Sequence, residues 1–241
     1  MVRLVYLSCL ILLLSALNAG AQERIVTIGL QYRPIIPVNF FGLGDVRAEE
    51  GSLSIDYLPQ VGSNLGVTLR KGLNERFSIE SGISFTKRNY NIRLTETEDS
   101  FEEEISVSFI GYEIPLQGLL YVQVNKEIYL NVSTGFSLDF FPSNIEGVGE
   151  RLIFNGLRFA WFRPAFSSNI GAEYRTPKSG YFYLGFTYHR PFDDIMVALS
   201  TYDEPDKLNR TLVTTLNGQY LTLDLRYFFN EPKQVKKPKK K

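Results

Sequence analysis

The 241-residue chain has one cysteine, one histidine and no excess of charge of either sign. Cys9 lies in the apolar stretch near the N-terminus, so a chain that loses this stretch has no thiol for disulfides, thiol catalysis or metal binding. The 26 basic residues equal the 26 acidic residues in number, which gives no support to nucleic acid as a partner. No cluster has the spacing of metal ligands. We therefore expect no metal and no cofactor.

Long apolar runs are also scarce, because the sequence has one, at residues 4–17. Arg3 precedes this run and the small residues 19–21 follow it. The run is shorter than the ~20 residues that a helix needs to span a bilayer. A basic start, a short apolar run and a small-residue site are typical of a secretory signal. We predict that residues 1–21 form a signal peptide and that the chain is exported to a bacterial envelope.

The rest of the chain alternates apolar and polar side chains in stretches of roughly ten residues, as membrane-spanning β-strands do. In residues 24–33, for example, Val26 and Leu30 share one face while Thr27 and Gln31 share the other. Seven further stretches repeat this pattern: 63–71, 76–88, 105–120, 130–140, 162–175, 182–189 and 221–229. The sequence therefore predicts eight two-faced strands.

The connections between these stretches alternate in length. Short turns fall near Gly72, Asn125 and Pro177, and long connections cover residues 34–59, 95–104, 142–157 and 191–212. Short periplasmic turns and long outer loops are typical of bacterial outer-membrane barrels. We predict an all-β fold: an eight-stranded antiparallel up-and-down transmembrane β-barrel over residues 22–229, in the outer membrane of a Gram-negative bacterium.

A soluble lipocalin-like barrel is the competing architecture. Such a barrel turns its apolar face inward, around a ligand. Here the apolar face carries bulky residues, whereas the opposite face carries charges and glycines. A soluble protein could not expose so much phenylalanine and leucine, so the membrane barrel is favoured.

Two irregularities are expected. Ile105, Val107 and Phe109 are out of phase with the rest of their strand, which predicts a bulge near Ile110 and Gly111. Pro115 and Pro164 each remove a backbone donor within a strand, and a bulge is expected to absorb them.

The inner face carries glycines where a narrow barrel needs small residues: Gly29, Gly66, Gly82, Gly135, Gly171 and Gly185.

Charges of both signs lie on the predicted inner face. We predict an ionic network in the lumen, formed by Arg70, Glu80, Arg88, Glu113, Asp139, Arg163, Glu173, Asp224 and Arg226. Isolated charges in so narrow a space would be costly, but paired charges form a polar core. The near balance of signs favours a plugged lumen. A narrow pore lined by one sign of charge is the alternative.

Residues 105–116, with the sequence ISVSFIGYEIPL, resemble the Y-x-E-I-P-L strand of the PorT-like outer-membrane β-barrel family, although Glu113 directly follows Tyr112 here. Residues 72–82, 129–136 and 169–174 resemble the same family. The resemblance implies an integral outer-membrane protein, usually without an assigned molecular activity. It carries over no catalytic or binding residue.

The chain continues past Phe229, the aromatic residue that ends the last predicted strand. Residues 230–241 form a basic tail with Lys233, Lys236, Lys237, Lys239, Lys240 and Lys241. One interpretation is a solvated tail. The other is a periplasmic anchor for anionic lipid headgroups or an acidic partner.

Two classes of function follow. The first is a non-enzymatic envelope protein that contacts outer-membrane lipid and binds envelope proteins through its outer loops or its tail. The second is an enzyme that modifies lipid A, with His189 as base and Asp193 or Asp194 beside it. By parity His189 faces the lumen, while lipid substrates arrive from outside. We therefore predict that the chain is not an enzyme.

Overall fold

The computed structural model describes residues 26–38, 43–74, 76–204 and 208–230, and this part of the chain is all-β. The predicted signal peptide and the tail lysines lie outside the described residues. No helix in the described ranges is long and apolar enough to cross a membrane. The strands are β1 (Val26–Ile36), β2 (Val46–Glu50), β3 (Leu53–Gly72), β4 (Phe77–Glu96), β5 (Phe101–Gln123), β6 (Ile128–Phe140), β7 (Ile145–Val148), β8 (Leu152–Arg158), β9 (Phe162–Arg175), β10 (Tyr181–Pro191), β11 (Met196–Tyr202), β12 (Arg210–Leu216) and β13 (Tyr220–Phe228).

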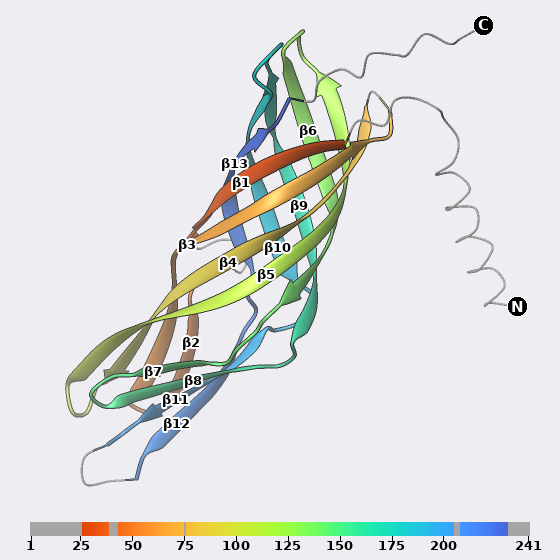
Figure 1. Ribbon diagram of the computed structural model, residues 1–241. Helices are drawn as coiled ribbons and strands as arrows, with labels where there is room; N and C mark the ends of the chain where they lie inside the picture. The colour runs from red at the N-terminus through yellow and green to blue at the C-terminus, as the bar shows by residue number, and fades with distance from the viewer. Residues whose placement is uncertain (1–25, 39–42, 75, 205–207, 231–241) are drawn as a thin grey trace, which may run out of the picture.

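Eight of these strands pair in one antiparallel succession that returns to its start. The order is β1-β13-β10-β9-β6-β5-β4-β3, and β3 pairs in turn with β1. Leu30 of β1 therefore has Tyr227 as its neighbour on one side and Val67 on the other. Each of the eight predicted stretches corresponds to one of these strands. We call these strands the ring (Figure 1).

The two faces of the ring strands are as predicted. Apolar side chains point away from the interior, and Leu116 and Phe136 are 61% and 62% exposed. Polar side chains point inward, and Thr187 and Asp224 are completely buried. This arrangement is the reverse of the one in a soluble protein. The prediction that the apolar face of the ring strands points outward and the polar face inward is confirmed.

The predicted long connections are not irregular loops: three of them contain strands, and the one predicted at residues 95–104 is a turn at 97–100 between β4 and β5. β3, β4 and β5 are 20, 20 and 23 residues long, about twice the 9–11 residues with which a strand crosses a bilayer. Beyond the ring their far halves continue to pair with one another, β2 pairs with β3, and a second sheet of order β12-β11-β8-β7 packs against them. We call this part the extension; it continues the ring towards the lower left in Figure 1. The segments are strands because their own alternating apolar residues have a core to face.

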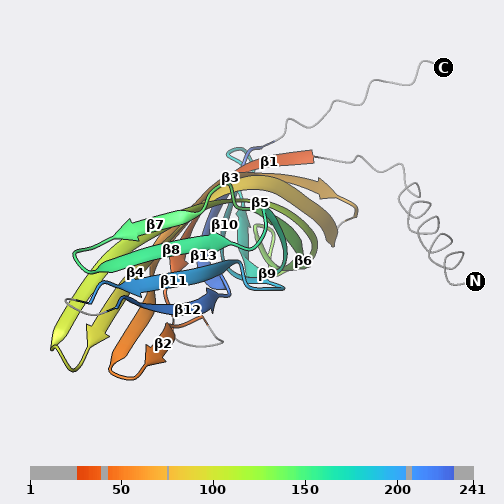
Figure 2. The same ribbon diagram turned by 90° about the horizontal axis from the view of Figure 1, so that it is seen from below.

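That core lies between two layers of strands. Figure 2 shows β7, β8, β11 and β12 in front of the far halves of β3 and β4. The side chains between the layers are apolar, including Leu53, Ile55, Tyr57, Ile92, Leu94, Val107, Phe109, Leu152, Phe154, Met196 and Tyr202. The extension is therefore packed like a soluble β-sandwich.

The predicted bulge near Ile110 and Gly111 is also wrong. The β4–β5 register is unbroken, from Arg88 opposite Phe109 to Ser84 opposite Glu113. Phe109 and Glu113 thus share the inner side of β5. Phe109 faces the apolar core of the extension, whereas Glu113 faces the polar interior of the ring. The alternation of β5 is constant along the strand, and only the side chains that surround its inner face change. The register shift falls instead on β3, between Gln60 and Ser63.

The two strand prolines also lie in unbroken register. Pro115 is opposite Ser137, and Pro164 is opposite Leu138. The Pro115 carbonyl accepts a hydrogen bond from the Ser81 hydroxyl at 2.8 Å, and the Pro164 carbonyl accepts one from the Phe192 N–H at 3.1 Å. The expected bulges are therefore not needed at either proline.

Candidate functional site

The interior of the ring contains two clusters of buried charge. The first gathers Arg70, Glu80, Glu173, Asp224 and Arg226. Arg70 Nη2 lies 2.9 Å from Glu80 Oε2, and Arg226 Nη1 lies 2.5 Å from the other Glu80 oxygen. Arg70 also pairs with Glu173, and Arg226 with Asp224. All five side chains are at most 6% exposed.

Local structure places the first cluster. Arg70 and Glu80 are directly opposite in the β3–β4 hairpin. Its turn is closed by Asn74, whose side-chain oxygen accepts the Arg76 and Phe77 N–H groups at 2.9 and 2.8 Å. The Arg70 guanidinium also lies 3.8 Å from the centroid of the Phe228 ring, a cation–π contact that holds it further.

The second cluster lies where the ring meets the extension. Glu113 accepts hydrogen bonds from Asn64 Nδ2 at 3.0 Å and from the Tyr220 hydroxyl. Arg33 Nη2 lies 3.3 Å from Glu113, and Arg88 Nη2 lies 4.0 Å from it. Each carboxylate oxygen of Glu113 therefore has charged or hydrogen-bonding partners, as a buried carboxylate requires.

Two contacts join strands that lie opposite each other in the ring. β3 and β9 are four places apart in the succession of eight strands, and Arg70 of β3 pairs with Glu173 of β9. β13 and β5 are also four places apart, and Tyr220 of β13 donates to Glu113 of β5. Each cluster thus contains a direct bond across the full width of the interior.

Neutral polar side chains fill the space between the clusters. Gln117 Nε2 donates to the Ser167 hydroxyl at 2.8 Å, and the Tyr183 hydroxyl donates to Asn169 Oδ1 at 2.5 Å. Tyr183 lies flat over Gly171 and Gly185, where an added Cβ would lie 2.3 Å from its hydroxyl oxygen. The glycines at these two facing positions let a tyrosine pack against the wall.

Of the nine predicted network residues, eight lie in the two clusters; Asp139 belongs to the second, where it lies 3.8 Å from Arg88 Nη2. Arg163 lies in neither, although it is opposite Asp139 in the register. It lies 3.5 Å from Asp193 at the rim, because the carboxylate of Asp139 is already bonded to His189. Arg33 and Tyr220 belong to the second cluster but are not among the nine. The alternation places both inward; their pairing with Glu113 depends on the tertiary structure.

The position of His189 does not fit the enzyme hypothesis. Its Nε2 lies 2.7 Å from Asp139 Oδ2, and its ring stacks on Tyr220 with centroids 4.6 Å apart. The side chain is 2% exposed, and the predicted neighbour Asp193 pairs with Arg163 instead. In the described part of the chain, no serine hydroxyl is hydrogen-bonded to His189, and no group of histidine, cysteine and acidic residues could hold a metal ion.

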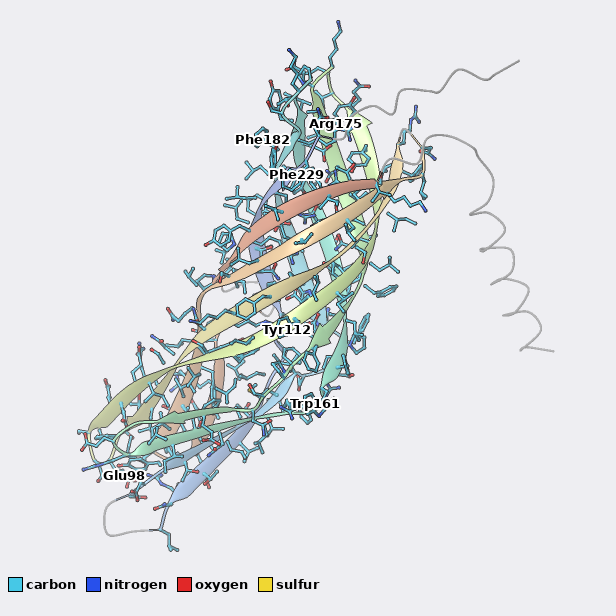
Figure 3. The ribbon with its side chains drawn as sticks, viewed as in Figure 1. Glu98, Tyr112, Trp161, Arg175, Phe182 and Phe229 are labelled. Atoms are coloured by element: carbon cyan, nitrogen blue, oxygen red, sulfur yellow. The ribbon has the colours of Figure 1, made fainter. Side chains whose placement is uncertain are left out.

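Aromatic side chains mark two levels on the outside of the ring. Near the end at which β1 starts and β13 ends, Phe182 lies 5.1 Å from Tyr227, which lies 5.2 Å from Phe229. Next to the extension, Phe140 lies 5.8 Å from Trp161 and 5.1 Å from Phe162. Figure 3 shows Phe182 and Phe229 near the end of the ring away from the extension, and Tyr112 and Trp161 towards the extension. Aromatic girdles of this kind flank the apolar band of membrane barrels.

One solved structure supports the fold. The chain is similar to the crystal structure of the outer membrane protein OprG from Pseudomonas aeruginosa, with a TM-score of 0.52 and 10% identity over 86% of this chain and 96% of that chain. Two further structures are less similar. The outer membrane protein AlkL has a TM-score of 0.43 and 11% identity over 90% of this chain and 97% of that chain. The outer membrane protease OmpT from Escherichia coli has a TM-score of 0.39 and 10% identity over 87% of this chain and 98% of that chain. No curated protein sequence matches.

The sequence itself matches a family over more than half of the chain. The match to the outer membrane protein beta-barrel domain covers residues 23–146 of 241. The narrower PorT-like assignment stays a prediction. The alternating strands, the outward apolar face and this match agree, and the chain belongs to the outer membrane protein beta-barrel domain family.

Proposed function

We propose that this protein is a closed eight-stranded transmembrane barrel with a plugged lumen that works without catalysis, as an anchor that holds the extension outside the outer membrane. The observation that carries the proposal is the pair of bonds across the interior, Arg70 to Glu173 and Tyr220 to Glu113. The PorT-like family usually has no assigned molecular activity, so the resemblance is compatible with a role without catalysis.

We infer the position of the membrane from the two aromatic levels. The apolar outer face lies between the level of Phe182 and Phe229 and the level of Tyr112 and Trp161 (Figure 3). The short turns lie at the first level, so this end faces the periplasm, and the extension lies on the outer side. Export by a signal peptide over residues 1–21 is part of this proposal.

The interior argues against a diffusion pore. A selective path is lined by charges of one sign or by ordered carbonyl groups. Here cations and carboxylates neutralise each other in both clusters, and each cluster bonds across the interior. Water-filled passage would require these buried pairs to separate, and breaking a buried pair is strongly unfavourable.

The same burial argues against an enzyme. A histidine base must reach the proton that it removes, either directly or through one water. His189 lies between Asp139 and the Tyr220 ring and is 2% exposed, so a lipid on the outer face cannot reach it. Its geometry suits a structural role in the second cluster.

The extension offers the surface for a partner. One outer face is charged, with Arg93 2.9 Å from Glu104 and Arg47 3.5 Å from Asp56. The outer face of β8, β11 and β12 carries apolar residues and threonines instead: Ile153, Leu157, Val197, Leu199, Thr201, Thr211 and Val213. We propose that envelope proteins bind this face, and that the tail lysines Lys233, Lys236, Lys237, Lys239, Lys240 and Lys241 add a salt-sensitive periplasmic contact.

The decisive experiment is electrical conductance in planar bilayers. The wild-type protein is expected to give no sizeable single-channel conductance. The double variant Arg70→Ala, Glu113→Ala removes one partner of each spanning bond and is expected to give small, measurable openings. A matched control, Arg47→Ala with Glu104→Ala, removes the same two residue types from the extension and should behave as the wild type. A reproducible open pore in the wild-type protein would overturn the plugged lumen, whether or not the double variant inserts.

A further inference from the structure

The outer face of the barrel is hollowed near its periplasmic end. A depression of about 720 Å³ lies across β1, β13, β10 and β9, between side chains of β3 and β6. Its walls are the apolar side chains of Leu30, Tyr32, Phe182, Leu184, Leu225 and Tyr227. In Figure 1, β1 and β3 cross the barrel more obliquely than β9, β10 and β13, and the depression spans this change of inclination.

A row of facing residues contributes four of the side chains that line the depression. Tyr32, Leu225, Leu184 and Ala172 are successive cross-strand neighbours on the outer face. Ala172 is the one small side chain of this row, and it lies between the larger Ile170 and Tyr174 of the same strand. The missing bulk at Ala172 leaves space that a larger residue would fill.

Among the described residues that line the depression, no charged side chain points into it. Glu173 and Arg226 border it, but their side chains turn into the interior of the barrel, where they are 0% and 4% exposed. Water therefore finds few polar partners there. Side chains that line an empty hollow lack dispersion contacts on the side that faces it. Hydrocarbon that fills the hollow would supply these contacts, so its binding is favourable.

We infer that the depression binds an acyl chain of a phospholipid from the periplasm-facing leaflet. This inference rests on the proposed membrane position, because the depression lies on the membrane side of the aromatic level formed by Phe182, Tyr227 and Phe229. Tyr227 also donates a hydrogen bond to the Ser179 carbonyl at 2.5 Å, which ties this rim to the β9–β10 turn. Lys178 lies exposed in the same turn, where a phospholipid phosphate would lie.

The test compares lipid retention in two variants of one strand. Ala172→Phe fills the depression, whereas Ile170→Phe adds the same ring to the same face of β9 outside it. The protein is purified from membranes, exchanged exhaustively into detergent, and its bound phospholipid is counted by mass spectrometry. We expect the wild type and Ile170→Phe to retain phospholipid, and Ala172→Phe to retain about tenfold less, which corresponds to ~1.4 kcal/mol of binding free energy.

A second measurement identifies what occupies the depression. Vesicles of phosphatidylethanolamine and phosphatidylglycerol that contain a phospholipid with a photoreactive acyl chain are irradiated with the inserted protein. Cross-links should map to the peptides of β9, β10 and β13 and disappear in Ala172→Phe. Equal retention and equal cross-linking in all three proteins would overturn the acyl-chain site. Loss of a dimer in Ala172→Phe without loss of lipid would overturn it too and would make this face an interface between copies.

The outcomes separate this inference from the proposed function. If the wild-type protein does not insert into vesicles, the membrane position is wrong. If all three proteins insert, show no single-channel conductance and give the same lipid retention and cross-linking, the proposed function is retained and the lipid site alone is wrong.

Discussion

At the scale of single residues, the inside of the barrel contains close approaches of a large side chain to glycines. Tyr183 packs on Gly171 and Gly185, and its hydroxyl is held by Asn169. Burial of a tyrosine is tolerated there because the hydroxyl has a partner. The two glycines are therefore required by packing and not by their backbone conformation.

Gly171→Ala is expected to destabilise the barrel by ~1–3 kcal/mol, as overpacking of a filled interior does. Its Cβ would lie 2.3 Å from the Tyr183 hydroxyl and 2.4 Å from the Leu184 carbonyl oxygen. Gly118→Ala is the matched control, because it is also in a ring strand and an added Cβ there meets no atom within 4 Å. Urea unfolding in lipid vesicles measures both variants. A cost at position 118 equal to that at position 171 would contradict the packing argument.

At the scale of elements, one strand serves two surroundings. β5 has polar inward residues in the ring and apolar inward residues in the extension, with an unbroken alternation between them. The two layers of the extension are also joined by polar bonds. The Tyr57 hydroxyl of β3 lies 2.7 Å from the Ser200 hydroxyl of β11, and burial raises the pKa of Tyr57 to about 12.

The same substitution should therefore have different costs in the two parts. Leu184→Arg places a charge on the lipid-facing side of the ring, two residues from Phe182 of the aromatic level, and is expected to cost ~1–2 kcal/mol, less than the ~2–4 kcal/mol of the same charge at the bilayer midplane. Ile153→Arg places the same charge on the outer face of the extension, where water solvates it, and should cost far less. Leu184 and Ile153 are 55% and 39% exposed, so burial does not explain a difference. Equal costs in a folding assay with vesicles would mean that the membrane position is wrong.

The extension should also loosen in acid. Burial acts to raise the pKa of Glu96, but hydrogen bonds from Ser52, the Glu98 N–H and Arg210 outweigh it, and the pKa is lowered. A carboxyl group whose folded pKa is depressed stabilises the fold above its unfolded pKa, and this stabilisation is lost as the pH falls through the folded value.

Hydrogen exchange of β4 and β12 at neutral pH and below pH 4 measures this effect. Exchange in both strands is expected to rise in acid, and Glu96→Gln should remove most of the pH dependence because its amide does not titrate. A wild-type extension with equal protection at both pH values would contradict the role of the Glu96–Arg210 pair.

At the scale of the whole molecule, the proposed membrane position puts the extension and the end of β13 on opposite sides of the membrane. The extension is fastened to the barrel by three continuous strands, β3, β4 and β5, so the two parts form one strand-built body. The basic tail follows β13 at the other end.

Truncation after Phe229 tests the tail. The barrel is expected to fold and insert unchanged, because β13 ends at Phe228. Binding to vesicles with anionic lipid, or to an acidic envelope partner, should fall and should fall further with salt, since basic residues supply the attraction. Sedimentation with vesicles at low and at high salt measures it. Identical binding of the full and truncated chains at low salt would leave the tail lysines without a role in binding.

The sequence by itself determined the eight ring strands, their facing and the membrane class, because a period of two residues reports directly which side of a strand faces lipid. It also placed Arg70, Glu80 and Glu113 on the inner face. Only the tertiary structure decided which charges meet. Arg70 and Glu173 are 103 residues apart in the chain, and their bond depends on β3 and β9 being opposite in the ring.

The extension was beyond the sequence pattern for a related reason. Val107 and Phe109 carry the same alternation as Tyr112 and Ile114, but their apolar side chains point the other way. Alternation reports that a strand has two different faces and is silent on whether lipid or a protein core covers the apolar one. That choice depends on β7, β8, β11 and β12 closing over the core, a long-range arrangement that no local pattern contains.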